Sequence, residues 1–246
     1  MRSVDRALSI LQVIAQRGEL SLTDIAAAVD VHKSTAFRLL GTLEARGMVE
    51  RVADGGAYRL AYGVVQLAAA ATRGYDLSVL SRPVCQQLAD QLGETVNIAI
   101  HDGLAVISID QIIGSAAVTT VNWVGQRTPM HATAAGKVFL AHLPESHLDT
   151  LELVAYTEHT TTDATALRDQ LVAVRDLGYA TSVEEHEVGL VAVAAPIRAF
   201  AGDVVAALVV SGPTFRLTPE ILPDLAAAVA AGATEISHLN GVPKPG

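Results

Sequence analysis

The stretch SLTDIAAAVDVHKSTAFRLLGTLEARGMVERVADGGAYRL, residues 21–60, decides the fold of the first part of this chain. Apolar residues recur at helical spacing over residues 22–29 and again over 33–46, with a short break at Asp30-Val31 between the two runs. Two strand-like runs then flank the glycine-rich turn 53–56. Two helices joined by a tight turn and followed by a hairpin predict a winged helix-turn-helix.

A further helix precedes this motif. Its apolar positions recur at helical spacing, and they are Val4, Ala7, Leu8, Leu11 and Ile14. This pattern predicts a helix over residues 3–16 that ends at Gly18. Ser21 is a candidate N-cap for the next helix, with Asp24 three residues further on. Small Ala26 and Ala27 would let the two helices of the motif approach each other closely.

The third helix would present a polar face to a nucleic acid. Its N-terminus carries partial positive charge that favours a phosphate. We expect Lys33 and Arg51 to bind phosphate, and Arg59 to do so from the wing, while Ser34, Thr35 and Arg38 would combine base and phosphate contacts. The full predicted set is Ser21, Thr23, His32, Lys33, Ser34, Thr35, Arg38, Arg51 and Arg59. The alternative is that these residues only cap the helix or form a solvated face.

Charge divides the chain unevenly. Residues 1–61 carry eight Lys/Arg and seven Asp/Glu, a net charge of +1, whereas residues 62–246 carry nine and nineteen, a net charge of −10. This asymmetry suggests two domains with different partners. Because the first part is nearly neutral, its affinity for DNA would have to come from local clustering of charge. The alternative is that the asymmetry reflects solubility alone.

Composition excludes several classes of protein. Half of the 246 residues are apolar and 17% are charged, so the chain can bury a core and wholesale disorder is excluded. The densest apolar run, residues 204–210, is too short for a membrane span. Charges interrupt the N-terminal region, which argues against a secretory signal. Cys85 is the only cysteine, so no internal disulfide and no multi-cysteine metal site is possible. A cytoplasmic protein is expected.

Residues 62–75 are rich in alanine and nearly uncharged, which predicts a connecting helix that ends at Gly74. Its apolar faces would pack either in a dimer or on its own domain. We therefore divide the chain into a DNA-binding domain, 1–61, a linker helix, 62–75, and a second domain, 76–246.

The second domain alternates helices with paired strands. Helices are predicted over 76–92, 132–142, 144–153 and 165–177, with a last one from Thr218-Pro219-Glu220 to about residue 239. Strands are predicted over 95–100, 104–109, 118–121, 179–183, 190–197 and 203–210. Hairpin-connected strands mixed with helices indicate an α+β fold with a mostly antiparallel sheet flanked by helices.

Five segments resemble a known family. SVDRALSILQVIA and VHKSTAFRLLGTLEARGMVER are similar to the first helix, recognition helix and wing of IclR-type (isocitrate lyase regulator) transcriptional regulators. Three blocks then follow in the family's order: GQRTPMHATAAGKVFLAHL, EEHEVGLVAVAAPIR and LVVSGPTFRLTPE. The resemblance spans nearly the whole chain. It implies a GAF-like effector-binding domain, and dimers or tetramers on palindromic operators.

The chain departs from the family pattern at three places. Ala61 stands where many members have glycine after the wing, and Thr181-Ser182-Val183 stand where many have acidic residues. Val209 replaces a serine that many members have. The last two departures fall in the expected pocket, so they favour a ligand less polar than the usual small acids.

Residues 132–137 open a helix after a proline-containing loop, and their small side chains would expose backbone N–H groups to an anion such as a carboxylate. Ser211 would add a hydroxyl, and Glu184 and Glu185 would bind ligand hydroxyls or pair with Lys137. From these residues and the resemblance together, the predicted pocket is Thr120, Thr128, Thr133, Ala134, Ala135, Gly136, Glu184, Glu185, Ala192 and Ser211. The alternative is that the glycine and alanines only allow close helix–sheet packing.

An enzyme or a metal site is the less favoured interpretation. His131, Glu184, Glu185 and His186 would supply metal ligands if they converged. However, adjacent strand residues point to opposite faces, and no HExxH, phosphate-binding loop or GxSxG motif is present. We therefore predict neither catalysis nor a cofactor nor a bound metal.

These observations predict a ligand-responsive DNA-binding regulator of a catabolic operon, either a repressor or an activator. Its effector would be a small organic acid or an aromatic catabolite. The alternative is a small-molecule sensor that acts through protein partners, with the winged helix as the interaction module.

Overall fold

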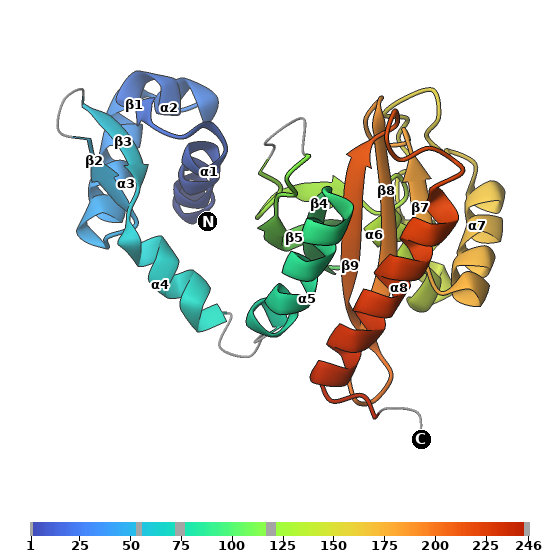
Figure 1. Ribbon diagram of the computed structural model, residues 1–246. Helices are drawn as coiled ribbons and strands as arrows, with labels where there is room; N and C mark the ends of the chain where they lie inside the picture. Colours follow the sequence, from blue (N-terminus) through green and yellow to red (C-terminus); the bar gives the residue numbers. More distant parts are fainter. Residues whose placement is uncertain (1, 53–55, 72–76, 117–121, 244–246) are drawn as a thin grey trace. The chain divides into compact units, whose positions relative to one another are not determined.

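The computed structural model describes residues 2–52, 56–71, 77–116 and 122–243 (Figure 1). The chain separates into two compact units, Met1–Asp76 and Leu77–Gly246. The predicted strand over 118–121, the end of the linker at Gly74 and most of the wing turn lie outside the described residues. Across the described residues, no helix is long and apolar enough to cross a membrane.

The first unit is a winged helix-turn-helix. Its elements in chain order are α1 Arg2–Arg17, β1 Leu20–Ser21, α2 Leu22–Ala28, α3 Lys33–Ala45, β2 Val49–Arg51, β3 Ala57–Leu60 and α4 Tyr62–Ala71. The three strands form an antiparallel sheet in the order β1-β3-β2. Its core consists of buried apolar side chains from the first three helices and from β2 and β3. They are Ile10, Ile14, Ile25, Leu40, Leu43, Val49 and Tyr58.

The start of α4 is attached to this unit. The backbone N–H of Gly63 donates to the carbonyl of Gly47 at 2.9 Å. A Cβ at Gly63 would lie 2.4 Å from that same carbonyl oxygen, so only glycine permits the approach. Packing on its own domain, one of the two alternatives for this helix, therefore holds for its first turn. Tyr62, Val65 and Leu67 nevertheless remain exposed.

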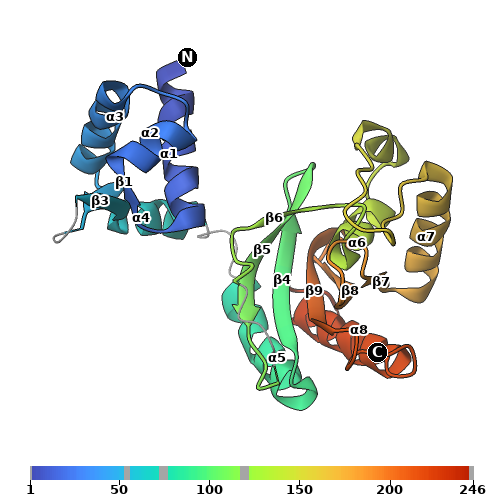
Figure 2. The ribbon, with the colours of Figure 1, turned by 90° about the horizontal axis from the view of Figure 1, so that it is seen from above.

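The second unit is a six-stranded antiparallel sheet with helices on both faces (Figure 2). Its helices are α5 Leu77–Leu92, α6 Ala134–His142, the 3-10 helix η2 Glu145–Thr150, α7 Ala164–Leu177 and α8 Leu222–Leu239. Its strands are β4 Thr95–His101, β5 Ala105–Ile112, β6 Arg127–Pro129, β7 Ala180–Val183, β8 Leu190–Arg198 and β9 Val204–Pro213. The strand order is β6-β5-β4-β9-β8-β7. This architecture confirms the predicted α+β fold.

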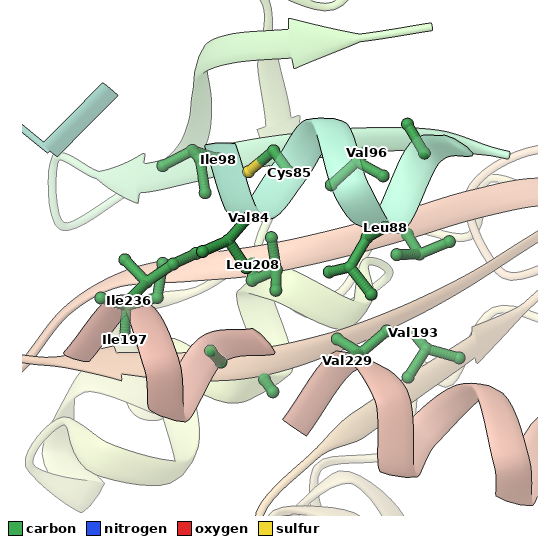
Figure 3. Close-up of a cluster of buried hydrophobic side chains, with 14 of the residues drawn as sticks. Val84, Cys85, Leu88, Val96, Ile98, Val193, Ile197, Leu208, Val229 and Ile236 are labelled. Atoms are coloured by element: carbon green, nitrogen blue, oxygen red, sulfur yellow. The ribbon is translucent and has the colours of Figure 1, made fainter. Parts of the chain in front are cut away.

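Strand alternation separates two cores. Large side chains such as Ile98, Val193 and Leu208 point to one face, where α5 and α8 cover them (Figure 3). Small side chains such as Ala194 and Ala207 point to the other face, under α6 and α7. Since successive strand residues alternate faces, this difference in size leaves room beside α6.

Cys85 lies in the core of α5 and the sheet (Figure 3). Burial raises the pKa of its thiol to about 12, so the thiol stays protonated at neutral pH.

Several predicted elements differ from the structure. The last helix begins at Leu222 with Pro223 in its first turn, and not at Pro219, because residues 218–221 form a turn instead. The predicted helix over 144–153 is the shorter η2. The helix expected from residue 132 begins at Ala134, with Thr133 as its N-cap. Strands β1 and β6 were not predicted. They have only two and three residues, which is too short for an alternating apolar pattern to be recognised in the sequence.

Candidate functional site

The outward face of α3 is polar and exposed around one aromatic ring. Its exposed residues include Lys33, Ser34, Phe37 and Arg38. The helix is capped by His32, whose Nδ1 accepts from the N–H of Ser34 at 3.4 Å and lies 2.8 Å from the Ser34 hydroxyl. Two of the predicted contact residues therefore also close the helix end, which was the alternative interpretation of this face.

The N-terminus of α2 shows the predicted cap. The Ser21 hydroxyl accepts from the N–H of Asp24 at 3.2 Å and donates to its carboxylate at 2.6 Å. Thr23 is exposed in the first turn of the same helix.

The two wing arginines have partners within the protein. The Arg51 guanidinium stacks against the rings of Phe37 and Tyr58, and its Nε donates to the Tyr58 hydroxyl at 2.9 Å. Arg59 donates to Glu50 at 2.7 Å and lies 3.5 Å from Glu19. The hydrogen bond to Glu50 and its charge raise the pKa of Arg59. The wing thus presents Arg51 next to α3, while the charge of Arg59 is partly balanced.

A cavity of about 90 Å³ lies in the second unit, between the small-residue face of the sheet and the N-terminus of α6. Residues from five strands, the start of α6 and two loops converge on it. They are Asn97, Ala99, Val106, Ser108, Trp123, Gln126, Thr128, Thr133, Ala134, Ala135, His186, Leu190, Ala192, Val209 and Ser211. Among these described residues the lining carries no Asp, Glu, Lys or Arg, so its polar groups are amides, hydroxyls, one imidazole and the indole of Trp123.

The start of α6 supplies hydrogen-bond donors to this cavity. The Thr133 hydroxyl accepts from the N–H of Gly136 at 3.2 Å and donates to the carbonyl of Pro129 at 2.7 Å. N–H groups in the first turn of a helix have no acceptor within it. Those of Ala134 and Ala135, two residues that line the cavity, are therefore available to an anion, and the helix dipole favours one there.

Two buried polar atoms at the cavity have no hydrogen-bond partner within the described structure: Asn97 Oδ1 and His186 Nδ1. Burial lowers the pKa of the His186 imidazole and so favours its neutral form. An unpaired buried polar atom is costly. Both atoms belong to residues of the cavity wall, which makes them candidate hydrogen-bond partners for a bound molecule.

Three of the predicted pocket residues that the structure describes do not line this cavity: Gly136, Glu184 and Glu185. Thr120 lies outside the described residues. Gly136 packs against the loop before α6, because a Cβ there would lie 2.1 Å from the Met130 carbonyl oxygen. Glu184 sits in a turn with φ of +56°, and its Oε1 accepts from the N–H of Gly189 at 2.7 Å. Glu185 pairs with Lys137.

The Lys137–Glu185 pair is buried. Lys137 Nζ lies 2.5 Å from Glu185 Oε1 and donates to the carbonyl of Thr181 at 3.3 Å. Burial lowers the pKa of Lys137, and the Glu185 charge opposes that shift. The pair fastens α6 to the loop that carries His186, and so it fixes two walls of the cavity.

The residues considered for a metal do not converge in the part of the chain that the structure describes, which holds no group of three or more His, Cys, Asp and Glu side chains suited to a metal ion. His131 Nε2 bonds to the carbonyl oxygen of Val154 at 2.9 Å.

Sequence reasoning missed much of the cavity wall. Asn97 carried a usable signal, since it is a polar residue within an apolar strand and shares a face with Ala99. Trp123, Gln126 and His186 lie in loops. No local sequence pattern predicts that these loops pack onto the sheet.

Comparisons with known proteins agree over nearly the whole chain. A family model described as the bacterial transcriptional regulator IclR C-terminal domain matches residues 69–238, and one described as the IclR helix-turn-helix domain matches residues 3–53. The HTH-type transcriptional regulator BhcR of Paracoccus denitrificans is 36% identical over 96% of this chain and 86% of its own length. The HTH-type transcriptional repressor AllR of Escherichia coli is 34% identical over 98% of this chain and 91% of its own.

A solved structure extends this likeness to a ligand complex. It is an IclR homologue from Microbacterium hydrocarbonoxydans complexed with 4-hydroxybenzoate. That protein is 25% identical to this chain, with a TM-score of 0.85 over 97% of this chain and 98% of its own.

Proposed function

Because this chain belongs to the IclR family of bacterial transcriptional regulators, we propose that α3 and the wing bind a palindromic operator and that a small organic acid in the cavity changes the affinity for it. The observation that carries the proposal is that one unit has an exposed polar helix face and the other has a cavity without charged side chains in its described lining. The proposal contains no catalytic step. We keep 1–61, 62–75 and 76–246 as its functional parts, acting in the cytoplasm.

The proposed operator contacts follow from exposure. Lys33 and Arg38 are exposed on α3, so Lys33 contacts phosphate and Arg38 reaches base edges in the major groove. Ser34 and Thr35 combine base and phosphate contacts at the same helix end. Ser21 and Thr23, at the start of α2, lie where the first helix of the motif crosses the backbone.

The proposed effector has one carboxylate, a short apolar body and one hydrogen-bond donor. The carboxylate binds the N–H groups of Ala134 and Ala135, while Ala99, Val106 and Val209 enclose the body. The donor completes the unpaired Asn97 Oδ1. The 4-hydroxybenzoate in the Microbacterium homologue is a molecule of this class, with one carboxylate, one ring and one hydroxyl.

The proposed protein is a dimer or a tetramer. A palindrome places two half-sites in two-fold symmetry, so one copy of α3 is required for each. Exposed apolar side chains on α1 and α4 support a contact between copies: Val4, Leu8, Tyr62, Val65 and Leu67. Sedimentation of the full chain tests the assembly, and a monomer at micromolar concentration would contradict it.

Genomic footprinting tests the function directly. The purified full-length protein is mixed with sheared DNA of its own organism, and the retained fragments are sequenced at two salt concentrations. We expect a palindrome beside genes for the catabolism of a small acid. The logarithm of its affinity should fall linearly with the logarithm of salt concentration. Retention of no DNA above background, with or without added metabolites, would instead support the alternative, a sensor that acts on protein partners.

A matched pair of ligands tests the effector class. Calorimetry of the full chain should detect 4-hydroxybenzoate more strongly than 4-hydroxybenzamide, which keeps the ring and hydroxyl but lacks the carboxylate. The variant Asn97→Leu removes the unpaired oxygen without leaving a hole, so its unfolding midpoint should hold or rise while the acid binds more weakly. Equal binding of acid and amide would contradict the helix-start site.

A further inference from the structure

Phe37 occupies an unusual place on the DNA-facing side of α3. Its ring is 51% exposed although phenylalanine is usually buried. It shares a face of the helix with Ser34, one turn before it, and with Gly41, one turn after it. The position of Gly41 opens onto free space, with nothing within 4 Å of where a Cβ would stand. A planar chemical group can therefore come close to the exposed part of the Phe37 ring.

The ring is also held in a defined orientation. The Arg51 guanidinium carbon lies 5.8 Å from the Phe37 ring centroid and 5.2 Å from that of Tyr58. The Arg51 Nε is fixed to the Tyr58 hydroxyl at 2.9 Å. The remaining Nη groups of Arg51 make no hydrogen bond or ion pair within the described residues, so they can donate to a phosphate while the guanidinium stays stacked on Phe37.

A phenyl ring has neither a donor nor an acceptor, so it cannot read the polar edge of a base pair. The one apolar group that B-DNA presents in the major groove is the C5 methyl of thymine. We propose that Phe37 contacts this methyl in each operator half-site and thereby specifies thymine at one position. Arg51 acts as a positioning residue that aims the ring from the wing strand. The inference rests on the proposed entry of α3 into the major groove.

Replacing thymine with deoxyuridine tests the contact, because it removes the methyl and leaves base pairing unchanged. The operator from the genomic selection is synthesised with dU at each thymine in turn, symmetrically in both half-sites. Full-length protein is titrated at one fixed salt concentration. A lost methyl contact weakens binding about four-fold per half-site, or about fifteen-fold for both. We expect this loss at one symmetric position.

Variants assign the effect to Phe37. In Phe37→Ala the dT/dU ratio at that position should fall to about one, whereas Phe37→Leu should keep part of it. Lys33→Ala, on the same helix, should weaken binding to both DNAs equally and keep the full ratio. Arg51→Ala should lower the ratio at the same position, which a general loss of stability would not do. Because the Phe37 ring is half exposed, the melting temperature should show that the variants fold.

Two outcomes would overturn the inference. One is an affinity that is indifferent to dU at every thymine. The other is a dU effect that survives unchanged in Phe37→Ala, which would assign the methyl to another residue. Both leave the operator itself bound, so they are distinct from failure of the proposed function, in which the wild-type protein shows no salt-dependent binding to any enriched sequence.

Discussion

Arg38 is the residue on α3 best placed to read a base edge. It is exposed beside Phe37, and its side chain forms no ion pair within the described structure. Arg38→Ala should weaken operator binding by ~1–3 kcal/mol and relax specificity at one base pair. The measurement is the dissociation constant on the operator and on its single-base variants. Arg46→Ala removes the same charge just past the end of α3 and serves as the control. An unchanged constant in Arg38→Ala would remove it from the contacts.

The small side chain of Ala135 leaves part of the cavity empty. Its side chain lines the cavity from the first turn of α6 and is 4% exposed. In Ala135→Leu the larger side chain should fill part of the cavity, so the effector response should be lost while the affinity for the operator is kept. A gel-shift titration with and without effector measures both. A normal response in this variant would place the effector elsewhere.

The Lys137–Glu185 pair should matter far more to stability than the exposed pairs. Lys137→Met leaves a buried carboxylate without its partner, which costs ~3–5 kcal/mol, whereas the double variant Lys137→Met/Glu185→Leu should recover most of that loss. Urea unfolding of the full chain measures both. Arg59→Met breaks the exposed pair with Glu50, and it should leave the unfolding midpoint nearly unchanged. A double variant as unstable as the single one would show that the charges themselves stabilise the fold.

At the scale of elements, two helical glycines should respond oppositely to alanine. A Cβ at Gly136 would lie 2.1 Å from the Met130 carbonyl oxygen, so Gly136→Ala must displace the loop before α6. This substitution should lower the free energy of unfolding by ~1–3 kcal/mol or more. Gly41 has open space in the middle of α3, so Gly41→Ala should stabilise by ~0.5–1 kcal/mol. Thermal unfolding compares them, and equal effects would contradict the close approach of α6 to its loop.

Sequence patterns predicted the winged helix well because each of its signals is local. The Ser21 cap and the face of Leu40 and Leu43 are all set by neighbours along the chain. The two very short strands lacked such signals. The last helix was placed too early because Pro219 and Pro223 both suit a helix start, and only the hydrogen bonds around residue 218 distinguish them.

The candidate site was predictable where it rests on a helix start and not where distant segments meet. Thr133, Ala134 and Ala135 follow from one motif, and they line the cavity. Glu185 was predicted as a ligand contact or a partner of Lys137, and burial favours the ion pair. Asn97 and His186 meet at the cavity only because β4 and the loop after β7 are brought together by the sheet, which a single sequence does not display.

At the scale of the whole molecule, the proposed coupling makes a reciprocal prediction. If the effector changes operator affinity by a factor of about 5–150, the operator must change effector affinity by the same factor. A fragment of residues 77–246 should therefore bind effector as the free full chain does and should ignore added operator. Calorimetry on the two proteins, with and without operator, measures this. A fragment whose effector affinity responds to DNA would contradict a division of labour between the units.

Because the described lining of the cavity is uncharged, binding of the effector and binding of the operator should respond differently to temperature and to salt. Burial of the apolar body of the effector in the cavity lowers the heat capacity, so the logarithm of effector affinity should depend on temperature in a curved manner. Operator binding depends instead on released counterions. Within the described lining no charged side chain links the first process to ionic strength. Temperature should therefore act mainly on effector binding, and salt concentration mainly on operator binding.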